Sequence, residues 1–502
     1  MARQNKFASS GGATATPVAK LMETIVEDVI TAKAMPFDEW HALSPNPLVP
    51  LAIPVSQGGQ YQVTQVGVDA ASTLSQQSWK SRDALRQTID RDAFMKLSFL
   101  AIGDTIRDCK GRLPKVPDGT NPEDVTLADD FFDALAADYE CRLDQLAAAA
   151  SFDVDRHIPC HLFHSDQAVP AFDVGPVRFM PRGEWLDCFI KDSEVRRLIR
   201  QTASGELSIE ELSARSIAES GDRRAAHALD VLHTLRHFSW VATLRMDGHE
   251  YLRSHFKASV VVGLAIDALG LRFQAEDARR FAKAGRQHLY AEDRFATTLD
   301  GRILRGSSVQ MPGLSGRPGA LAAKMVAEKS FLDAAGCILQ HYVDGRRTGT
   351  ALHLVERWIN ALYWVGEARR EASDFMAVVD YGCAADGLSG AGGGAGDMTR
   401  FAEAALKPVN GTVPTGTVTV GAAVQQVYRE GRNKLAHGEV PGLLEDLAEP
   451  RAVGDALLSA LFDVVTPVLA DLLKNEPNVK VVDEKHAFRL LEAKLTARKA
   501  GA

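Results

Sequence analysis

The residues best suited to chemistry lie near the C-terminal end of the chain, in the segment Tyr428-Arg-Glu-Gly-Arg-Asn-Lys-Leu-Ala-His-Gly438. Arginine is a permanent planar cation that matches a phosphate group, and histidine exchanges protons near neutral pH. Arg432 and His437 together therefore suit cleavage of RNA through its own 2′-hydroxyl. In that reaction a base removes the hydroxyl proton, the oxygen attacks phosphorus, and an acid protonates the leaving 5′-oxygen. Asn433 is placed to orient the imidazole or the phosphate, and the chemistry needs no metal and no cofactor.

Helix geometry limits how these side chains can meet. Asn433 and His437 are four residues apart and share one helix face, whereas Arg432 and His437 lie about 140° apart on an ideal helix. Gly438 is a natural helix terminator, so the helix can unwind beside His437. Alternatively, two copies of the domain contribute residues to one shared cleft. We favour the second arrangement, helped by the first, and it predicts a homodimer or a higher oligomer.

Four or five amphipathic helices with short connections are predicted between Gly349 and Asn475, the pattern of an antiparallel bundle. The Gly-rich segment Gly387–Gly396 is a connector, Asp397 caps a short third helix, and the motif lies in a fourth helix that begins near Thr419. The predicted inward-facing residues are Leu352, Val355, Ile359, Leu362 and Gly366 in the first helix; Phe375, Met376, Val379 and Cys383 in the second; Val420, Val424, Val427, Gly431 and Leu435 in the fourth; and Val453, Leu457, Leu461, Val464, Val468 and Leu472 in the fifth.

The segment Arg432-Asn-Lys-Leu-Ala-His-Gly438 resembles the signature of the HEPN superfamily, most closely its Apea-like branch. The resemblance covers about Leu352–Leu473 and includes Trp358-Ile-Asn-Ala-Leu-Tyr-Trp364 and Cys383-Ala-Ala-Asp-Gly-Leu388. The family usually has a glutamate where this chain has Asp386, which makes Asp386 a possible acidic helper. Upstream, His157–Phe163 and Val174–Met180 look like regions that precede this domain in large Apea-like proteins.

This resemblance implies a metal-independent endoribonuclease that is dimeric and acts on tRNA or other cellular or phage RNA, as a toxin or anti-phage effector. Carried over by position, Arg432 and His437 are catalytic and Asn433 is their polar companion. Lys434, Arg429 and Tyr428 beside the motif are candidates for RNA contact. The superfamily also contains non-catalytic members, so an RNA-binding, partner-binding or dimerisation protein is the alternative.

The whole chain is predicted to be mainly α and multi-domain, with α-rich regions and small β-hairpins before the HEPN-like bundle. Helices are expected at Val18–Ala34, Ser81–Arg112 and Leu127–Ala150, then at Glu184–Thr202, Ser208–Ser220 and, with breaks, Arg223–Leu269. Hairpins are expected at Ala168–Phe179, turning at Gly175-Pro176, and at Phe295–Val309, turning at Asp300-Gly301. The predicted regions are a disordered tail (1–17), a mostly helical region (18–150), a middle α+β region (151–345), the bundle (346–476) and a C-terminal helix or tail (477–502).

Composition narrows the functional classes. The net charge of −8 argues against a general basic surface for nucleic acid, although it does not exclude a local site. The six cysteines include no Cys-x-x-Cys pair, as expected of reduced thiols in the cytoplasm. We find no apolar run long enough for a bilayer and therefore expect no membrane partner. A regulatory protein or trigger molecule acting on the N-terminal regions is expected.

Two further histidine groups were considered for metal binding. His157, Cys160, His161 and His164 are types of ligand that zinc accepts, but their spacing fits no common finger and Pro159 lies among them. A structural loop is favoured there, and a metal hydrolase at this cluster stays as a third hypothesis. His233 and His237 lie four apart without the glutamate of a zinc-protease helix, so they are expected to be packed or surface residues.

Overall fold

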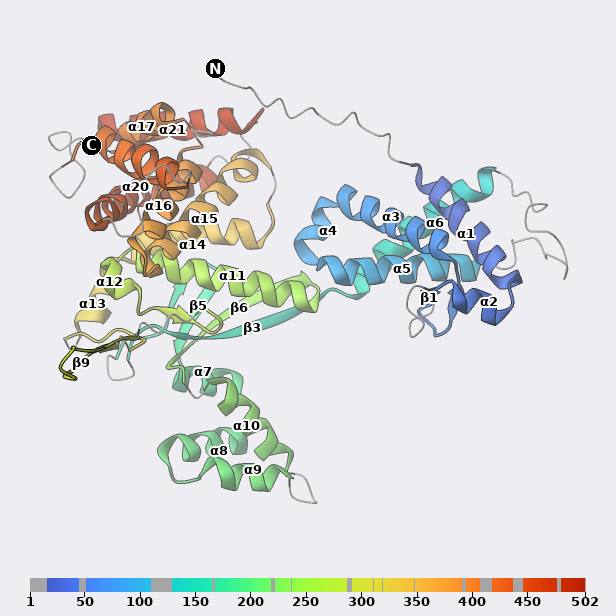
Figure 1. Ribbon diagram of the computed structural model, residues 1–502, viewed down its shortest axis with the longest axis horizontal. Helices are drawn as coiled ribbons and strands as arrows, with labels where there is room; N and C mark the ends of the chain where they lie inside the picture. The colour runs from blue at the N-terminus through green and yellow to red at the C-terminus, as the bar shows by residue number, and fades with distance from the viewer. Residues whose placement is uncertain are drawn as a thin grey trace. The chain divides into compact units, whose positions relative to one another are not determined.

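The computed structural model describes residues 16–44, 51–109, 129–164, 168–217, 222–235, 237–286, 291–309, 311–317, 319–346, 348–390, 394–406, 418–436, 446–475 and 480–501. These residues are mainly helical and include one five-stranded and two two-stranded sheets, which confirms the predicted fold class at that level. The chain divides into two compact units (Figure 1). The first comprises Met1–Val154 and Met246–Phe256, and the second comprises Asp155–Arg245 and Lys257–Ala502.

The first unit is a group of helices around one hydrophobic core. Its longest helices are amphipathic, and the two short strands β1 and β2 pair antiparallel between them. The elements are α1 (Val18–Ala34), α2 (Phe37–Ala42), β1 (Ala52–Pro54), β2 (Gln60–Gln62), α3 (Gln65–Ser81), α4 (Asp83–Thr88), α5 (Arg91–Asp108) and α6 (Asp129–Ala149).

The helix predicted at Val18–Ala34 is confirmed, and α6 lies within the predicted Leu127–Ala150. Helix α3 was missed. Its buried face consists largely of glycine, alanine and serine, so the sequence shows no strong apolar stripe there. Ser75 and Ser98 on this buried side share a hydrogen bond of 2.7 Å, which satisfies their hydroxyls inside the core.

The five-stranded sheet has the order β4-β5-β6-β3-β7. The predicted hairpin at Gly175-Pro176 is confirmed, because Val174 pairs with Val177 across the turn. Strands β3 and β6 were not predicted; the sequence of β6 had been assigned to helix. The strands are β3 (Phe152–His161), β4 (Phe172–Val174), β5 (Val177–Pro181), β6 (Trp240–His249) and β7 (Ala282–Lys283).

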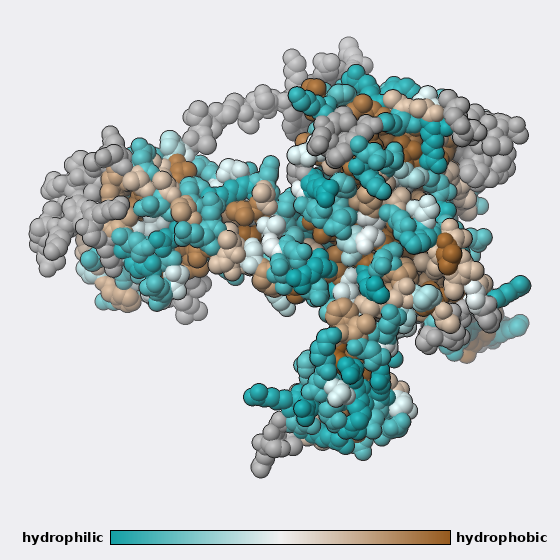
Figure 2. All heavy atoms as spheres, turned by 180° about the vertical axis from the view of Figure 1, so that it is seen from behind, coloured by the Kyte–Doolittle hydropathy of each residue, from teal (hydrophilic) through white to brown (hydrophobic). Residues whose placement is uncertain are grey.

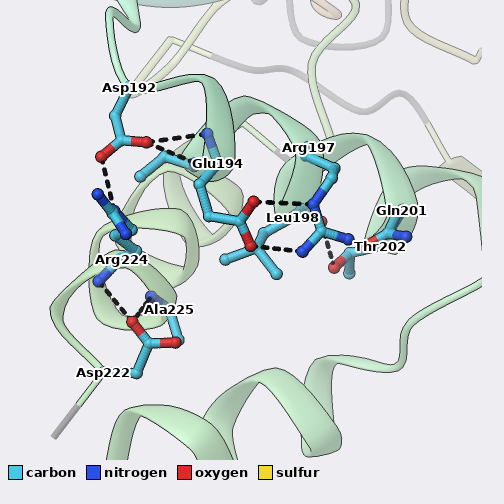
Figure 3. Close-up of polar contacts among 10 residues, drawn as sticks. Asp192, Glu194, Arg197, Leu198, Gln201, Thr202, Asp222, Arg224 and Ala225 are labelled. Atoms are coloured by element: carbon cyan, nitrogen blue, oxygen red, sulfur yellow. Dashed lines mark hydrogen bonds and ion pairs between the residues drawn. The ribbon is translucent and has the colours of Figure 1, made fainter.

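Four described helices lie between β5 and β6 in the sequence, and α8 to α10 form a small lobe whose apolar core continues into α7 and into Met180 and Val241 of the sheet. Figure 2 shows a mainly hydrophilic surface over this lobe. Asp192 caps α8 by accepting from the amide of Glu194 and also accepts from Arg224 Nε at 2.9 Å, which ties α8 to α10 (Figure 3). The helices are α7 (Arg182–Phe189), α8 (Ser193–Ser204), α9 (Ile209–Ile217) and α10 (Arg223–Leu235).

The chain then continues from β6 towards the bundle through helices and one hairpin. The hairpin predicted at Asp300-Gly301 is confirmed by the pairing of Thr297 with Ile303. These elements are α11 (Tyr251–Gly270), α12 (Ala275–Ala278), β8 (Ala291–Thr297), β9 (Ile303–Val309), α13 (Ala320–Ala327) and α14 (Lys329–Val343).

The C-terminal helices pack around α16, which contacts α15, α20 and the π-helical segment η3. The Trp358 side chain of α15 fills the centre and donates through Nε1 to Thr466 Oγ1 at 3.1 Å. The elements are α15 (Gly349–Arg370), α16 (Asp374–Ser389), α17 (Ala395–Ala405), α18 (Val420–Val424), η3 (Gln425–Asn433), α19 (Lys434–Ala436), α20 (Ala448–Asn475) and α21 (Glu484–Gly501).

The predicted inward faces hold for the fourth helix, hold for the first and fifth with one residue each not buried, and fail for the second. On α15, Leu352 is 40 % exposed although the other residues of the predicted stripe are buried. On α16 the prediction was wrong, because Met376 is 43 % exposed while Phe375, Val379 and Cys383 are only half-buried. The buried face instead consists mainly of Ala377, Val378, Tyr381, Ala384, Ala385 and Leu388.

Helix α20 is the most apolar long helix of the bundle, although aspartates interrupt its apolar sequence. By length and composition α20 could cross a membrane, and among the described residues it is the single helix that meets this test. In the structure 61 % of its most apolar stretch is buried, as in the core helix of a bundle.

Candidate functional site

The predicted fourth helix begins where the sequence indicated, and it has three parts. Thr419 is the N-cap and accepts a hydrogen bond from the amide of Ala422 through its hydroxyl at 3.2 Å. The chain then runs through α18, the nine residues of η3 and α19; we call Val420–Ala436 the motif helix. A π-helix is rare, usually spans a single turn and is frequent at functional sites. The longer π-helical stretch here contains Arg432 and Asn433.

The motif helix is anchored by an apolar face and by a close approach to α16. Val424 and Val427 are buried, as predicted. A Cβ atom added at Gly431 would lie 2.5 Å from Val378 Cγ1, and one added at Gly382 would lie 2.4 Å from Arg432 Cβ. Both glycines are therefore needed where these two helices touch. The contact sets the position from which the Arg432 side chain extends.

Arg432 is half-buried between its own helix and α16. Its Nη1 atom donates to the Tyr428 hydroxyl at 3.2 Å, and the guanidinium carbon lies 5.4 Å from the centre of the Tyr428 ring. Such a cation–π contact contributes about 0.5–1 kcal/mol. Cys383 and Asp386 on α16 complete its surroundings.

These neighbours set the charge state of the site. Burial lowers the pKa of the Arg432 guanidinium, but its hydrogen bond to the Cys383 thiol and the nearby Tyr428 and Asp386 outweigh this and raise the pKa. Burial and the charge of Asp386 raise the pKa of Tyr428, while Arg432 opposes them. The site thus presents a permanent cation, held by a neutral phenol and lying near a carboxyl group.

The structure brings together three of the predicted residues, Arg432, Tyr428 and Asp386. Tyr428 is only 2 % exposed, so its ring is not available to stack on a base as an RNA contact would require; its hydroxyl supports Arg432 instead. Asn433 is half-buried, whereas Arg429 and Lys434 are exposed on the motif helix. His437 and Gly438 lie outside the described residues.

Cys383 is the member of this group that sequence reasoning missed, because it was assigned to the apolar core of α16. A signal for it was present, since Cys383 and Asp386 are three residues apart and share one face of a helix. Their common neighbour, Arg432, is distant in sequence. The tight contact at Gly382 was needed to place them together.

In the candidate cluster His157–His164, the favoured loop was wrong for His157, Cys160 and His161, which lie in strand β3, while His164 lies just after it. His157 lies in β3, and its Nδ1 atom is 3.0 Å from Thr243 Oγ1 and 3.1 Å from Trp185 Nε1. Cys160 is fully buried, and burial raises the pKa of its thiol far above the usual range. Alternation along the strand puts Cys160 on the face opposite to His157 and His161.

Among the described residues, no group of three His, Cys, Asp or Glu side chains is arranged to hold a metal ion. No protein-family model, curated protein or solved structure matches the chain.

Proposed function

We propose that the C-terminal bundle is an endoribonuclease that cleaves RNA without a metal ion. One observation carries the proposal: the Arg432 guanidinium is held from both sides, by Tyr428 and by the Cys383–Asp386 face of α16, within a π-helical stretch. A preorganised cation stabilises the charge that develops on a phosphate in the transition state. Exposed Arg429 and Lys434 flank it and supply further positive charge for an RNA backbone.

The proposed reaction uses the 2′-hydroxyl of the substrate as the nucleophile. A general base takes its proton, the 2′-oxygen bonds to phosphorus, and the bond from phosphorus to the 5′-oxygen breaks. A general acid then protonates the 5′-oxygen, which leaves a 2′,3′-cyclic phosphate and a 5′-hydroxyl. We assign proton transfer to His437, phosphate stabilisation to Arg432 and orientation to Asn433. The second proton-transfer group comes from another copy of the chain, so the active form is a homodimer or a higher oligomer.

In this proposal the chain is a toxin or anti-phage effector located in the cytoplasm. Its substrate is tRNA or another cellular or phage RNA. The regions before the bundle restrain it or respond to a trigger molecule or regulatory protein. These roles of the chain are proposed from the HEPN-like, Apea-like signature around Arg432. They depend on the RNA cleavage activity, which the experiment below tests.

The experiment compares the full chain with Arg432→Ala and His437→Ala on bulk tRNA in the presence of EDTA. Each substitution should slow cleavage about 100-fold or more, the loss typical of removing one transition-state contact. Arg489→Ala is the matched control, because Arg489 is an exposed arginine of the same bundle on α21 and should leave the rate unchanged. Circular dichroism melting checks that each variant is folded.

Arg432 also contacts α16, so Arg432→Lys serves as a second variant that keeps a charge but loses the planar fork. It should fold normally and still cleave at least about tenfold more slowly, a loss of about 1.4 kcal/mol. Wild-type rates in both His437→Ala and Arg432→Ala, or loss of activity on chelation, would overturn the proposal.

The alternative is a non-catalytic bundle that binds RNA or a partner, or that serves dimerisation. Its support is that the Tyr428 hydroxyl and the Cys383 thiol engage Arg432 inside the protein, as they would engage a structural arginine. Under this alternative the wild-type chain retains tRNA in a gel-shift assay, with no new RNA ends, in the presence or absence of cell extract from infected cells. Cleavage that depends on His437 rejects it.

A further inference from the structure

A cavity of about 470 Å³ lies in the second unit, between the end of β3, the start of α7 and the segment that joins α10 to β6. Its lining includes His164, Arg182, His237, Phe238 and Trp240. We call it the histidine cavity. A volume of this size is within the range of small-molecule sites in proteins.

Strand pairing and three hydrogen bonds build the cavity from distant parts of the sequence. Pro181 pairs with Trp240 in the sheet, and the Arg182 amide donates to the Ser239 carbonyl at 2.9 Å. The Phe163 carbonyl accepts from Trp240 Nε1 at 2.8 Å and from Ser239 Oγ at 3.2 Å. These contacts hold the residue after Phe163, which is His164, beside the start of α7 and the end of α10.

The imidazoles of His161, His164 and His237 are close enough to influence one another. His161 does not line the cavity and is 8 % exposed, with its ring 4.7 Å from that of Phe238, which does line it. Burial lowers the pKa of His161 first, and the positive charges of His164 and His237 lower it further.

Among the lining residues that the structure describes, Arg182, His164 and His237 are the ionisable ones, and none is Asp or Glu. The Arg182 guanidinium also donates through Nη1 to the Leu235 carbonyl at 3.3 Å. By contrast, a larger cavity of about 650 Å³ elsewhere in this unit contains Asp277, Asp455 and Asp463 together with its cations. Glu184, in the first turn of α7, is the nearest acidic residue in sequence; it is exposed and does not line the histidine cavity.

The start of α7 adds to this positive character. Pro181 is its N-cap and provides no side-chain cap; the Arg182 amide donates to the Ser239 carbonyl, and the next amide of the turn is that of Gly183. A Cβ atom added at Gly183, which lines the cavity, would have no atom within 4 Å, so the space in front of that turn is open. Helix N-termini favour negative groups.

We propose that the histidine cavity binds the phosphate group of a small phosphorylated molecule. The Arg182 guanidinium donates charge-assisted hydrogen bonds to the phosphate oxygens, and the ring N–H groups of His164 and His237 are further donors. Phe238 offers an apolar surface for the rest of the molecule. The site is separate in sequence and in elements from the motif helix, so it stands whether or not the bundle cleaves RNA.

The test is isothermal titration calorimetry of the full chain at about pH 6 and about pH 7.5 with three probes: inorganic phosphate, a nucleoside 5′-monophosphate and the corresponding nucleoside. The two phosphates should bind once per chain and the nucleoside should not bind. Binding should persist at both pH values, because Arg182 keeps its charge throughout this range. Equal affinity for the two phosphates identifies free phosphate as the ligand, and tighter binding of the monophosphate identifies a phosphate ester.

Two variants and a matched control locate the site. Arg182→Gln and His237→Gln should each weaken phosphate binding about tenfold, the loss expected for one hydrogen bond to a charged group. His233→Gln is the control, because His233 is exposed on α10 and does not line the cavity. His237 is itself exposed, so His237→Gln should fold normally. Absence of phosphate binding, unchanged affinity in both variants, or equal binding of the nucleoside would overturn the proposal, as would stoichiometric zinc in the purified protein.

Discussion

The motif helix and the histidine cavity differ in how far along the chain their functional groups are separated. The motif helix has most of its chemistry within one continuous segment, and α16 contributes two further side chains, Cys383 and Asp386. The histidine cavity takes its three ionisable lining residues from separate places: His164 follows β3, Arg182 begins α7 and His237 precedes β6. The motif helix can therefore be recognised in a continuous stretch of sequence, whereas the histidine cavity forms only after the strands have paired.

The histidines illustrate the difference. Sequence proximity groups His157 with His161 and His164, and His233 with His237. In the structure His157 contacts Trp185 and Thr243, and His233 is exposed on α10. His161 and His164 instead share an electrostatic environment with His237. Spacing along the chain therefore identified the right residue types but combined them incorrectly.

The largest effect is expected at Gly382. A substitution there tests whether the motif helix depends on α16, an element that is distant from it in sequence. In Gly382→Ala the new Cβ atom would lie 2.4 Å from Arg432 Cβ, so α16 and η3 must separate. The free energy of unfolding should fall by about 2 kcal/mol, as for overpacked cores, and Arg432 should shift from its contacts. Urea denaturation measures the loss.

Gly396→Ala is the control for this substitution. Gly396 lies in α17 of the same bundle, and a Cβ atom there has nothing within 4 Å. It should leave stability unchanged or raise it slightly, because alanine favours a helix. Equal stability of the two variants would show that the contact between α16 and the motif helix is not tight.

A smaller effect is expected at Trp240, which tests whether strand contacts build the histidine cavity. Trp240→Phe removes the indole donor to the Phe163 carbonyl and leaves only Ser239 Oγ. Unfolding free energy should fall by about 1–2 kcal/mol, and phosphate affinity should fall with it. Trp364→Phe is the comparison, because Trp364 is 38 % exposed. It should change the free energy of unfolding and the phosphate affinity by no more than about half of the change caused by Trp240→Phe. Unchanged phosphate binding in Trp240→Phe would show that the cavity does not depend on the hydrogen bond from Trp240 to the Phe163 carbonyl.

The smallest effect concerns pH and tests one titrating group of the bundle, Asp380. Burial, with the charges of Glu371 and Glu367, raises the pKa of Asp380 on α16 from 3.8 to about 6. The folded form therefore prefers the protonated acid, and this stabilisation is present below pH 3.8 and lost as the pH rises through about 6. Asp380→Asn should raise stability at neutral pH by about 1 kcal/mol, allowing for partial solvation, and should be neutral near pH 4. Thermal melts across this range measure it, and the same gain at both pH values would contradict the assignment.

Several elements could be predicted because local sequence carried their signals. The helix Val18–Ala34, the hairpins at Gly175 and Gly301, and the start of the motif helix at Thr419 each follow from apolar period, turn glycines or a capping hydroxyl. Arg432 was identified in the same way, from a continuous segment. The dimeric cleft and the roles of Arg432 and His437 stay predictions.

Other elements could not be predicted, for reasons that the structure supplies. In β6 both faces are buried from Trp240 to Leu244, so the strand has no alternating pattern. In β3, Pro159 argues against a strand. On α16 the larger apolar residues suggested the wrong inward face, because close packing against the motif helix selects small residues such as Gly382.

The central claim, that the bundle cleaves RNA through the 2′-hydroxyl, is tested most directly by the chemistry of the product ends. The full chain is incubated in EDTA with an end-labelled RNA, and the fragments are mapped and their termini identified by mass spectrometry. The same RNA is then made with a single 2′-deoxy nucleotide on the 5′ side of the cut. We predict a 2′,3′-cyclic phosphate, a 5′-hydroxyl and no cleavage at the deoxy position. A 5′-phosphate product, or a cut at the deoxy position, would contradict the account.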